Sequence, residues 1–143
     1  MLAVAVVALF GLAACGPAGV GSTTPSTPET TSSTASPLVG PAKFAAAIAD
    51  PVRITINVHV PFEGRLAGTD LMIPYDQIPQ QVSRLPADRT RPLAIYCRSG
   101  PMSAAAARSL AALGYTDIVE LAGGMQAWQA SGRPVSQTRP SSR

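Results

Sequence analysis

The sequence predicts an α/β domain built on a central, mainly parallel β-sheet with helices on both faces. Strand-like and helix-like segments alternate between about residues 39 and 136, which is typical of parallel strands joined by helices. The stretch "RPLAIYC" (91–97) is a largely apolar run, typical of a strand buried on both faces of a parallel sheet. With 143 residues, the chain has room for one globular domain of about 100 residues.

The first half of this domain is expected to contain one helix and two strands. The helix begins at Pro41, which is tolerated in a first turn, and ends before Asp50. The β-branched, alternating stretch "VRITINVHV" (52–60) predicts a strand. The stretch "DLMIP" (70–74) predicts a second, shorter strand.

The second half surrounds the apolar strand with further elements. Apolar residues keep helical spacing in "DQIPQQVSRL" (76–85), which predicts a helix. A longer, alanine-rich helix is predicted over 103–113 and is stopped by Gly114. The strand "DIVEL" (117–121) and the helix "GGMQAWQASG" (123–132) complete the alternation.

The first fifteen residues are not expected to belong to the domain. The apolar run before Cys15 is too short to cross a bilayer of about 30 Å as a lone helix, and it ends in small residues as signal peptides do. "LAAC" (12–15) also resembles the cleavage box of bacterial lipoproteins, whose cysteine is acylated and becomes the new N-terminus. This resemblance implies an extracytoplasmic protein anchored to the bacterial cell membrane by lipidated Cys15. An ordinary secretory peptide with an incidental cysteine is the alternative.

Residues 16–38 are dominated by Ser, Thr, Pro and Gly. Such a segment buries too little apolar surface to offset the entropy of ordering it, so we expect a disordered tether. The domain is then placed at 39–136, followed by a flexible tail at 137–143.

Charge and cysteine content limit the function. The net charge is +3, but the basic residues are scattered and form no basic stripe with interleaved aromatics, so no nucleic-acid partner is expected. If Cys15 is acylated, Cys97 is the only free thiol and no internal disulfide can form. A two-cysteine oxidoreductase is therefore disfavoured.

The stretch "YCRSGPMS" (96–103) carries the candidate site. Cys97 follows the apolar strand, at the edge of the sheet where α/β proteins bind ligands. The loop after it leads into a helix, whose N-terminal N–H groups and dipole favour an anion and hence a nucleophilic thiolate. The alternative is a purely structural role, in which Cys97 is buried and packs as a small apolar residue. The candidate binding loop is Arg98, Ser99, Gly100, Pro101, Met102 and Ser103.

Three stretches resemble the single-domain rhodaneses, a sulfurtransferase family: "YCRSG" (96–100), "LAGGMQAW" (121–128) followed by "GRPV", and "EGRLAGTDLMIP" (63–74). The resemblance extends over about residues 41–136. It implies a rhodanese-like fold in which Cys97 accepts sulfane sulfur as a persulfide and the backbone of the loop holds the outer sulfur. The implied partners are a small donor, such as thiosulfate or a low-molecular-weight persulfide, and a thiol or cyanide-like acceptor. No metal or other cofactor is expected.

The sequence departs from this family at two places. Met102 stands where many members have an arginine, which puts recognition of thiosulfate in question. Asn57 and His59 stand in the place of the usual Asp-Val-Arg triplet. Either His59 pairs with Glu63 in place of the usual arginine, or it reaches the Cys97 thiol and activates it.

Further candidates and alternatives remain at the sequence level. Arg65 lies on the same loop as Glu63, near the pocket rim that the resemblance implies. A phosphatase or arsenate reductase would need an arginine closing a slightly longer loop, and positions 102–107 offer none. The stronger alternative is a lipid-tethered, non-catalytic binding module of the same fold.

Overall fold

The computed structural model of this protein describes residues 36–139. The predicted signal peptide, Cys15 and most of the predicted tether lie outside the described residues and stay predictions. The elements, in chain order, are β1 (Leu38–Val39), α1 (Pro41–Ile48), β2 (Ile54–Asn57), β3 (Leu71–Met72), the 3₁₀ helix η1 (Val82–Arg84), β4 (Leu93–Tyr96), α2 (Pro101–Ala112), β5 (Ile118–Leu121) and α3 (Gly124–Ala130).

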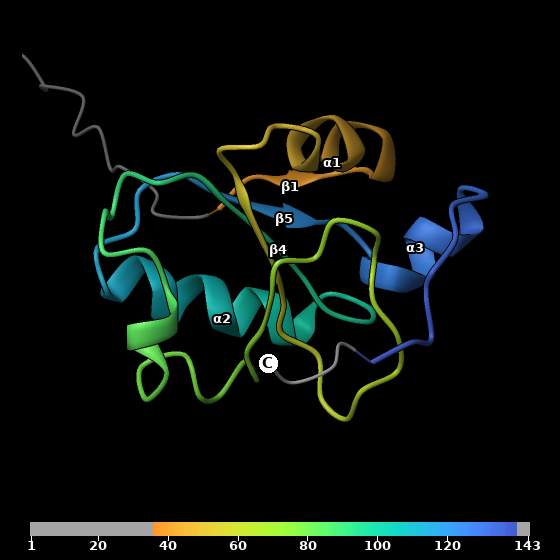
Figure 1. Cartoon of the computed structure of the whole chain (residues 1–143). Coiled ribbons are helices and arrows are strands. Elements are labelled where there is room, and N and C mark those ends of the chain that lie inside the picture. The colour runs from red at the N-terminus through yellow and green to blue at the C-terminus, as the bar shows by residue number, and fades with distance from the viewer. Residues whose placement is uncertain (1–35, 140–143) are drawn as a thin grey trace, which may run out of the picture. The chain divides into compact units, whose positions relative to one another are not determined.

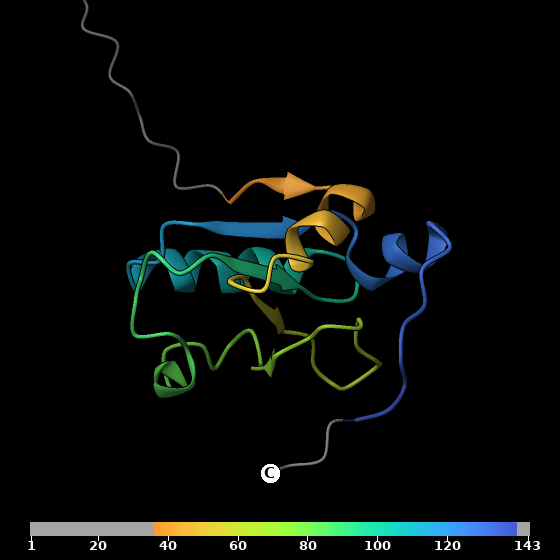
Figure 2. The same ribbon diagram turned by 45° about the horizontal axis from the view of Figure 1, so that its top comes forward.

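The five strands form one sheet in the order β1-β5-β4-β2-β3, and every neighbouring pair is parallel. The strand predicted from the apolar run is β4, which lies at the centre between β2 and β5. Helices α1 and α2 lie on opposite sides of the sheet (Figure 1), and the view in Figure 2 shows the same layers from another angle. The predicted α/β architecture with helices on both faces is confirmed.

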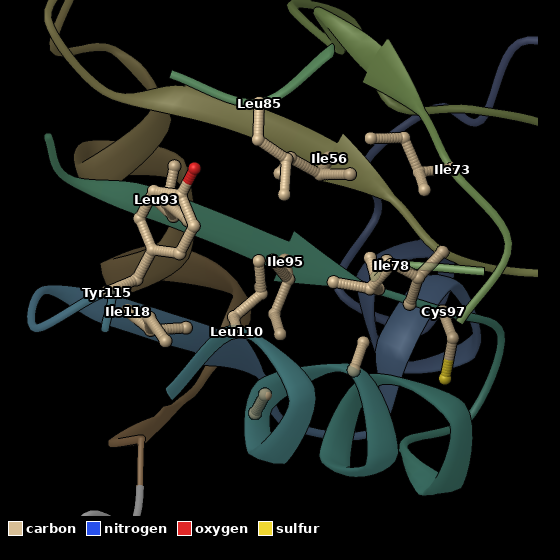
Figure 3. Close-up of a cluster of buried hydrophobic side chains, with 13 residues drawn as sticks. Ile56, Ile73, Ile78, Leu85, Leu93, Ile95, Cys97, Leu110, Tyr115 and Ile118 are labelled. Atoms are coloured by element: carbon tan, nitrogen blue, oxygen red, sulfur yellow. The ribbon is translucent and has the colours of Figure 1, made fainter. Parts of the chain in front are cut away.

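Two apolar clusters fill the space on the two faces of the sheet. On the α2 face, Ile95 packs with Leu110 in the cluster drawn in Figure 3. On the other face, Tyr96 packs with Phe44 of α1 and Trp128 of α3, and the Phe44 ring meets both aromatic neighbours edge to face. Each fully buried large apolar side chain contributes roughly 1.5–3 kcal/mol, so β4 is the best-supported strand.

The helix predicted over 76–85 is wrong. Only Val82–Arg84 is helical, as a single 3₁₀ turn. Pro79 has no N–H to donate and disfavours helical geometry in the residue before it. Ile78 and Leu85 are nevertheless buried in the α2-face cluster, so the apolar spacing in this stretch marked burial rather than a helix.

The other predicted helices and strands are confirmed, with different bounds. Helix α2 begins at Pro101, two residues earlier than predicted, because proline suits the first position of a helix. Within 52–60 only β2 belongs to the ladder, although the N–H of Val58 still donates to the Tyr96 carbonyl at 2.9 Å. The two-residue strand β1 was not predicted, because so short a segment carries no periodicity.

The ends of the described chain are held by the domain. In β1, Leu38 is paired with Glu120 of β5, so the sheet begins within the stretch predicted as tether. Near the other end, the Arg65 side chain donates to the Thr138 carbonyl at 3.1 Å. None of the helices in the described part of the chain is long and apolar enough to cross a membrane.

Candidate active site around Cys97

Cys97 lies directly after β4, at the carboxyl end of the central strand. Its side chain belongs to the α2-face cluster and is 1% exposed, and Figure 3 shows its sulfur beside the start of α2. The carboxyl ends of parallel strands are where ligands bind in open α/β sheets. The structure therefore places this thiol at the edge of the sheet that the sequence predicted.

Gly100 turns the loop back over the sulfur. Its N–H donates to the Cys97 Sγ at 3.0 Å, and its φ of 124° lies in the region that favours glycine. Ser99 and Pro101, on either side of it, are exposed. A backbone N–H aimed at the sulfur stabilises a thiolate or persulfide anion more than a neutral thiol.

The first turn of α2 forms one wall of the site. Ser103 is fully buried, with its Oγ 3.8 Å from the Cys97 Sγ, and it donates to the Gly100 carbonyl at 2.8 Å. Met102 packs against the same apolar cluster as Cys97. The N–H groups of Met102 and Ser103 have no backbone acceptor within residues 36–139, so the helix N-terminus keeps free donors beside the loop.

The start of α3 clamps the backbone of the loop from the other side. The N–H of Met125 donates to the Cys97 carbonyl at 2.9 Å, and that of Gln126 donates to the Arg98 carbonyl at 3.0 Å. This close approach needs Gly124, because a Cβ there would lie 2.4 Å from the Cys97 carbonyl oxygen. The motif "LAGGMQAW" therefore acts on the site through backbone groups.

A chain of charged side chains holds the exposed end of Arg98. The Arg98 guanidinium contacts both oxygens of Glu63, at 2.7 and 3.0 Å, and the second oxygen lies 2.6 Å from the His59 Nε2. The hydrogen bond to His59 and, more weakly, the charge of Arg98 keep the pKa of Glu63 below its ordinary value of 4.5. Glu63 is thus ionised, and His59 donates to it. Arg98 and Glu63 also line a pocket of about 360 Å³, whose lining does not include Cys97.

Asn57 and His59, the two departures from the family triplet, are joined to each other. The Asn57 Oδ1 accepts from the His59 N–H at 2.9 Å, and its Nδ2 donates to the Gly64 carbonyl at 2.9 Å. An amide can do both, which a carboxylate cannot. Two roles were considered for His59, and the pairing with Glu63 is the one that the structure shows. No hydrogen bond in residues 36–139 joins His59 to Cys97.

Tyr96 anchors the loop that carries Glu63. Its buried hydroxyl accepts from the Leu66 N–H at 3.0 Å and lies 2.6 Å from the Thr69 hydroxyl, and burial raises the pKa of Tyr96. Arg65, on the same loop, is directed elsewhere, because its backbone pairs with Ser136. The structure does not bring Arg65 together with the groups around Cys97.

Sequence reasoning missed two features near the site. One is the pair of N–H groups from Met125 and Gln126, for which the double glycine before them was the signal. The other is Glu120, a buried carboxyl group within an apolar strand. Its position in such a strand was the signal, because charged residues are almost never fully buried without a reason. Among the described residues, no three His, Cys, Asp or Glu side chains gather as a metal site requires.

Comparisons with known protein families agree with this geometry. Residues 53–131 match the family described as the Rhodanese-like domain. The matched region is more than half of the chain, and the chain belongs to the rhodanese-like family. The fold is thus that of one known family, and sulfurtransferase function is supported at the level of that family.

Individual relatives show how far the similarity reaches. A sulfurtransferase of Allochromatium vinosum is 40% identical over 65 residues, which are 46% of this chain and 59% of the relative. A rhodanese-related protein of Thermoplasma volcanium has a TM-score of 0.60 and 30% identity, over 71% of this chain and 99% of that one. The rhodanese-like domain of an Anabaena protein has a TM-score of 0.61 over 75% of this chain and 86% of its own, and at 20% identity it shows the fold alone.

Proposed function

We propose that this domain is a sulfurtransferase that carries sulfane sulfur as a persulfide on Cys97. The observation that carries the proposal is the Gly100 N–H, which points at the Cys97 sulfur at 3.0 Å in a loop clamped by α3. A cysteine that only fills space in the core needs no donor aimed at its sulfur. The family match supports the same reaction class.

In the first step, the Cys97 thiolate attacks the outer sulfur of a donor R–S–SH. A bond forms between the two sulfurs while the bond to the donor's inner sulfur breaks, and the electron pair leaves with RS⁻. The proton stays on the outer sulfur, so the products are Cys97–S–SH and RS⁻. The free N–H groups of Met102 and Ser103 supply donors for the added sulfur at the N-terminus of α2.

In the second step, an acceptor thiolate or cyanide attacks the outer sulfur of the Cys97 persulfide. The sulfur–sulfur bond on the enzyme breaks, and its electron pair returns to Cys97 as the thiolate. With a thiolate acceptor the sulfane sulfur keeps its oxidation state in the new persulfide, and with cyanide the acceptor itself supplies the two electrons as thiocyanate forms, so no further oxidant or reductant is needed. This agrees with a site that relies on one cysteine.

The site suits a small persulfide better than thiosulfate. Thiosulfate carries two negative charges, whereas Met102 adds no charge to the loop and the Arg98 charge is already paired with Glu63. Cys97 is 1% exposed, so a donor must present its outer sulfur at a narrow end. At the reacting end of a low-molecular-weight persulfide there is at most one negative charge, whereas thiosulfate carries both of its charges beside the sulfur that is transferred.

The test is intact mass measurement of the purified protein after incubation with glutathione persulfide and, separately, with thiosulfate. We expect the gain of one sulfur atom with the persulfide, its loss on adding cyanide, and no gain in Cys97→Ser. Thiosulfate should react more slowly. If the folded protein gains no sulfur from either donor, the sulfurtransferase hypothesis is contradicted. The non-catalytic binding module is then the better interpretation.

A further inference from the structure

A pocket of about 360 Å³ lies beside the loop that follows Cys97. Its lining includes Arg98 of this loop, Gln126 and Gln129 of α3, and Gln137 of the C-terminal segment. Figures 1 and 2 show that segment running back from α3 past the loop that carries Glu63. The volume is within the range of about 300–1,000 Å³ that is typical of small-molecule sites.

The C-terminal wall of the pocket is tied to the rest of the domain. Arg65 and Ser136 exchange both backbone hydrogen bonds at 2.8 Å. Val135, which lines the pocket, packs so closely on Gly64 that a Cβ on this glycine would lie 2.6 Å from the Val135 Cγ1. Because these contacts hold the wall in place, the pocket is formed before any ligand binds, as most small-molecule sites are.

The lining offers amide groups and no net charge. The Arg98 guanidinium lies 2.7 and 3.0 Å from the two oxygens of Glu63, so these two charges are paired. Gln126 and Gln129 are three residues apart on α3, and their side chains are neighbours on the helix surface. Both are exposed, and neither side-chain amide has a hydrogen-bond partner within residues 36–139. Each amide has an acceptor oxygen and an NH₂ donor, which suits a ligand with amide groups of its own.

The pocket is close to the reacting residue, although Cys97 does not line it. The N–H of Met125 donates to the Cys97 carbonyl and that of Gln126 to the Arg98 carbonyl, so the pocket wall contacts the backbone at Cys97 directly. Arg98 lines the pocket and directly follows Cys97, and neighbouring Cα atoms are only about 3.8 Å apart. A donor R–S–SH whose sulfur reaches Cys97 therefore has this pocket within reach of its R group.

We propose that this pocket binds the R group of the sulfur donor and selects a peptide-like R group, whose amides pair with Gln126 and Gln129. An amide in the ligand supplies the donor and the acceptor that these side chains lack within the described chain. A compact dianion such as thiosulfate gains no net attraction from a pocket without net charge. The inference rests on the proposed function and deepens it, because it names the class of donor.

The first experiment measures binding without sulfur transfer. S-methylglutathione has two amide groups but no thiol and no sulfane sulfur, so it cannot react with Cys97. Ligand-observed NMR titration of the full-length protein compares wild type with the double variant Gln126→Leu with Gln129→Leu. Both positions are exposed and leucine suits a helix as well as glutamine does, so this variant should fold. We expect its Kd to be about tenfold higher than that of wild type, as the loss of two neutral hydrogen bonds allows.

The second experiment measures donor choice. The second-order rate constant of persulfide formation is determined for glutathione persulfide and for methyl persulfide, whose R group has no amide. We expect the ratio of the first constant to the second to be about tenfold lower in the double variant than in wild type. Comparing the two proteins cancels the difference in intrinsic reactivity between the donors. Gln80→Leu, the same change at an exposed position outside the pocket, should leave this ratio and the Kd as in wild type.

The two experiments separate this inference from the proposed function. If the double variant equals wild type in its Kd for S-methylglutathione or in its donor ratio, the inference is overturned, even where persulfide forms on Cys97. If wild type forms no persulfide from either donor, the proposed function fails. A tenfold weaker binding of S-methylglutathione by the double variant would then still support the pocket as a site for peptide-like ligands.

Discussion

The two sides of the loop from Cys97 to Ser103 are built from different chemistry. The sulfur side, formed by Cys97, Met102 and Ser103, is buried to a large degree and carries no charged side chain. The clamp side, formed by the start of α3 and the chain from Arg98 through Glu63 to His59, holds the loop with two backbone hydrogen bonds and a charged network. Charge is used to hold the loop, and it is kept away from the sulfur.

This difference assigns the tasks within the site. The clamp side fixes where the loop backbone runs, while the sulfur side offers N–H groups and a hydroxyl to the reacting atom. Backbone donors favour an anionic sulfur without adding a charge that would select a charged donor. The comparison predicts that changes on the clamp side disturb the fold and the reaction together, and that changes on the sulfur side alter donor choice.

The largest effect is expected from breaking the backbone clamp with Gly124→Ala. The added Cβ would lie 2.4 Å from the Cys97 carbonyl oxygen, so α3 and the loop must separate. We expect a loss of about 3 kcal/mol or more in the free energy of unfolding, from strain at a positive φ together with overpacking. Urea denaturation measures it, and persulfide formation should fall more than about tenfold.

Gly132→Ala is the matched control for this substitution. Gly132 also has a positive φ, of 81°, but nothing lies within 4 Å of an added Cβ. It should cost about 1–2 kcal/mol from conformation alone and leave persulfide formation unchanged. Similar losses from the two variants would mean that the clamp is not specific to Gly124.

A smaller effect is expected from placing a charge on the sulfur side with Met102→Arg. The guanidinium would offer a thiosulfate dianion the cation that this loop lacks, and we expect kcat/KM for thiosulfate to rise about tenfold, as one charge-assisted hydrogen bond allows. The value for glutathione persulfide should change less than about threefold. Met102→Gln, which is polar but uncharged, is the control. An equal gain with Met102→Gln would show that charge is not what limits thiosulfate.

The smallest effect is expected from Glu63→Gln, which weakens the charged network of the clamp side. The pKa of Glu63 is lowered in the folded state, chiefly by the hydrogen bond to His59. The carboxylate therefore stabilises the fold above its ordinary pKa of 4.5, and this contribution disappears as the pH falls through the lower folded value. Wild type should melt at a higher temperature than Glu63→Gln at pH 6, and the difference in melting temperature should narrow as the pH is lowered through the folded pKa of Glu63.

Salt provides the check on this last prediction. Glu63 and Arg98 are both partly open to solvent, so about 1 M NaCl should narrow the gap at pH 6 by screening their charges. A difference in melting temperature that narrows neither with salt nor with falling pH would show that Glu63 acts through packing rather than charge.

The sequence was sufficient for the elements whose signal is local. The apolar run of β4, Pro41 at the start of α1 and Gly114 after α2 each determine an element through burial or backbone geometry. The failure at 76–85 has an equally local cause, because spacing alone was read as helical while Pro79 prevents the helix. The strand β1 was beyond reach, since two residues gain their structure only from pairing with β5.

The residues of the candidate site also fall into two groups, those that the sequence could identify and those that it could not. Cys97 and Gly100 could be identified from the strand–loop–helix pattern, because a single stretch carries them. The sequence could not decide whether His59 contacts Glu63 or Cys97. The side-chain alternation of a strand predicts orientation only within the strand, and His59 lies beyond its end. The network around Arg98 depends on segments 35 residues apart, and such distances are set by the sheet order rather than by the local sequence.

The pairing of Arg65 with Ser136 has a practical consequence for handling this protein. The two residues exchange both backbone hydrogen bonds at 2.8 Å, and Arg65 lies two positions from Glu63. A bulky fusion or surface attachment placed just after Thr138 would therefore pull on the loop that orients Arg98. An attachment ahead of β1 would instead act on the strand at the opposite edge of the sheet. Assays with immobilised protein should therefore attach it on the N-terminal side of β1.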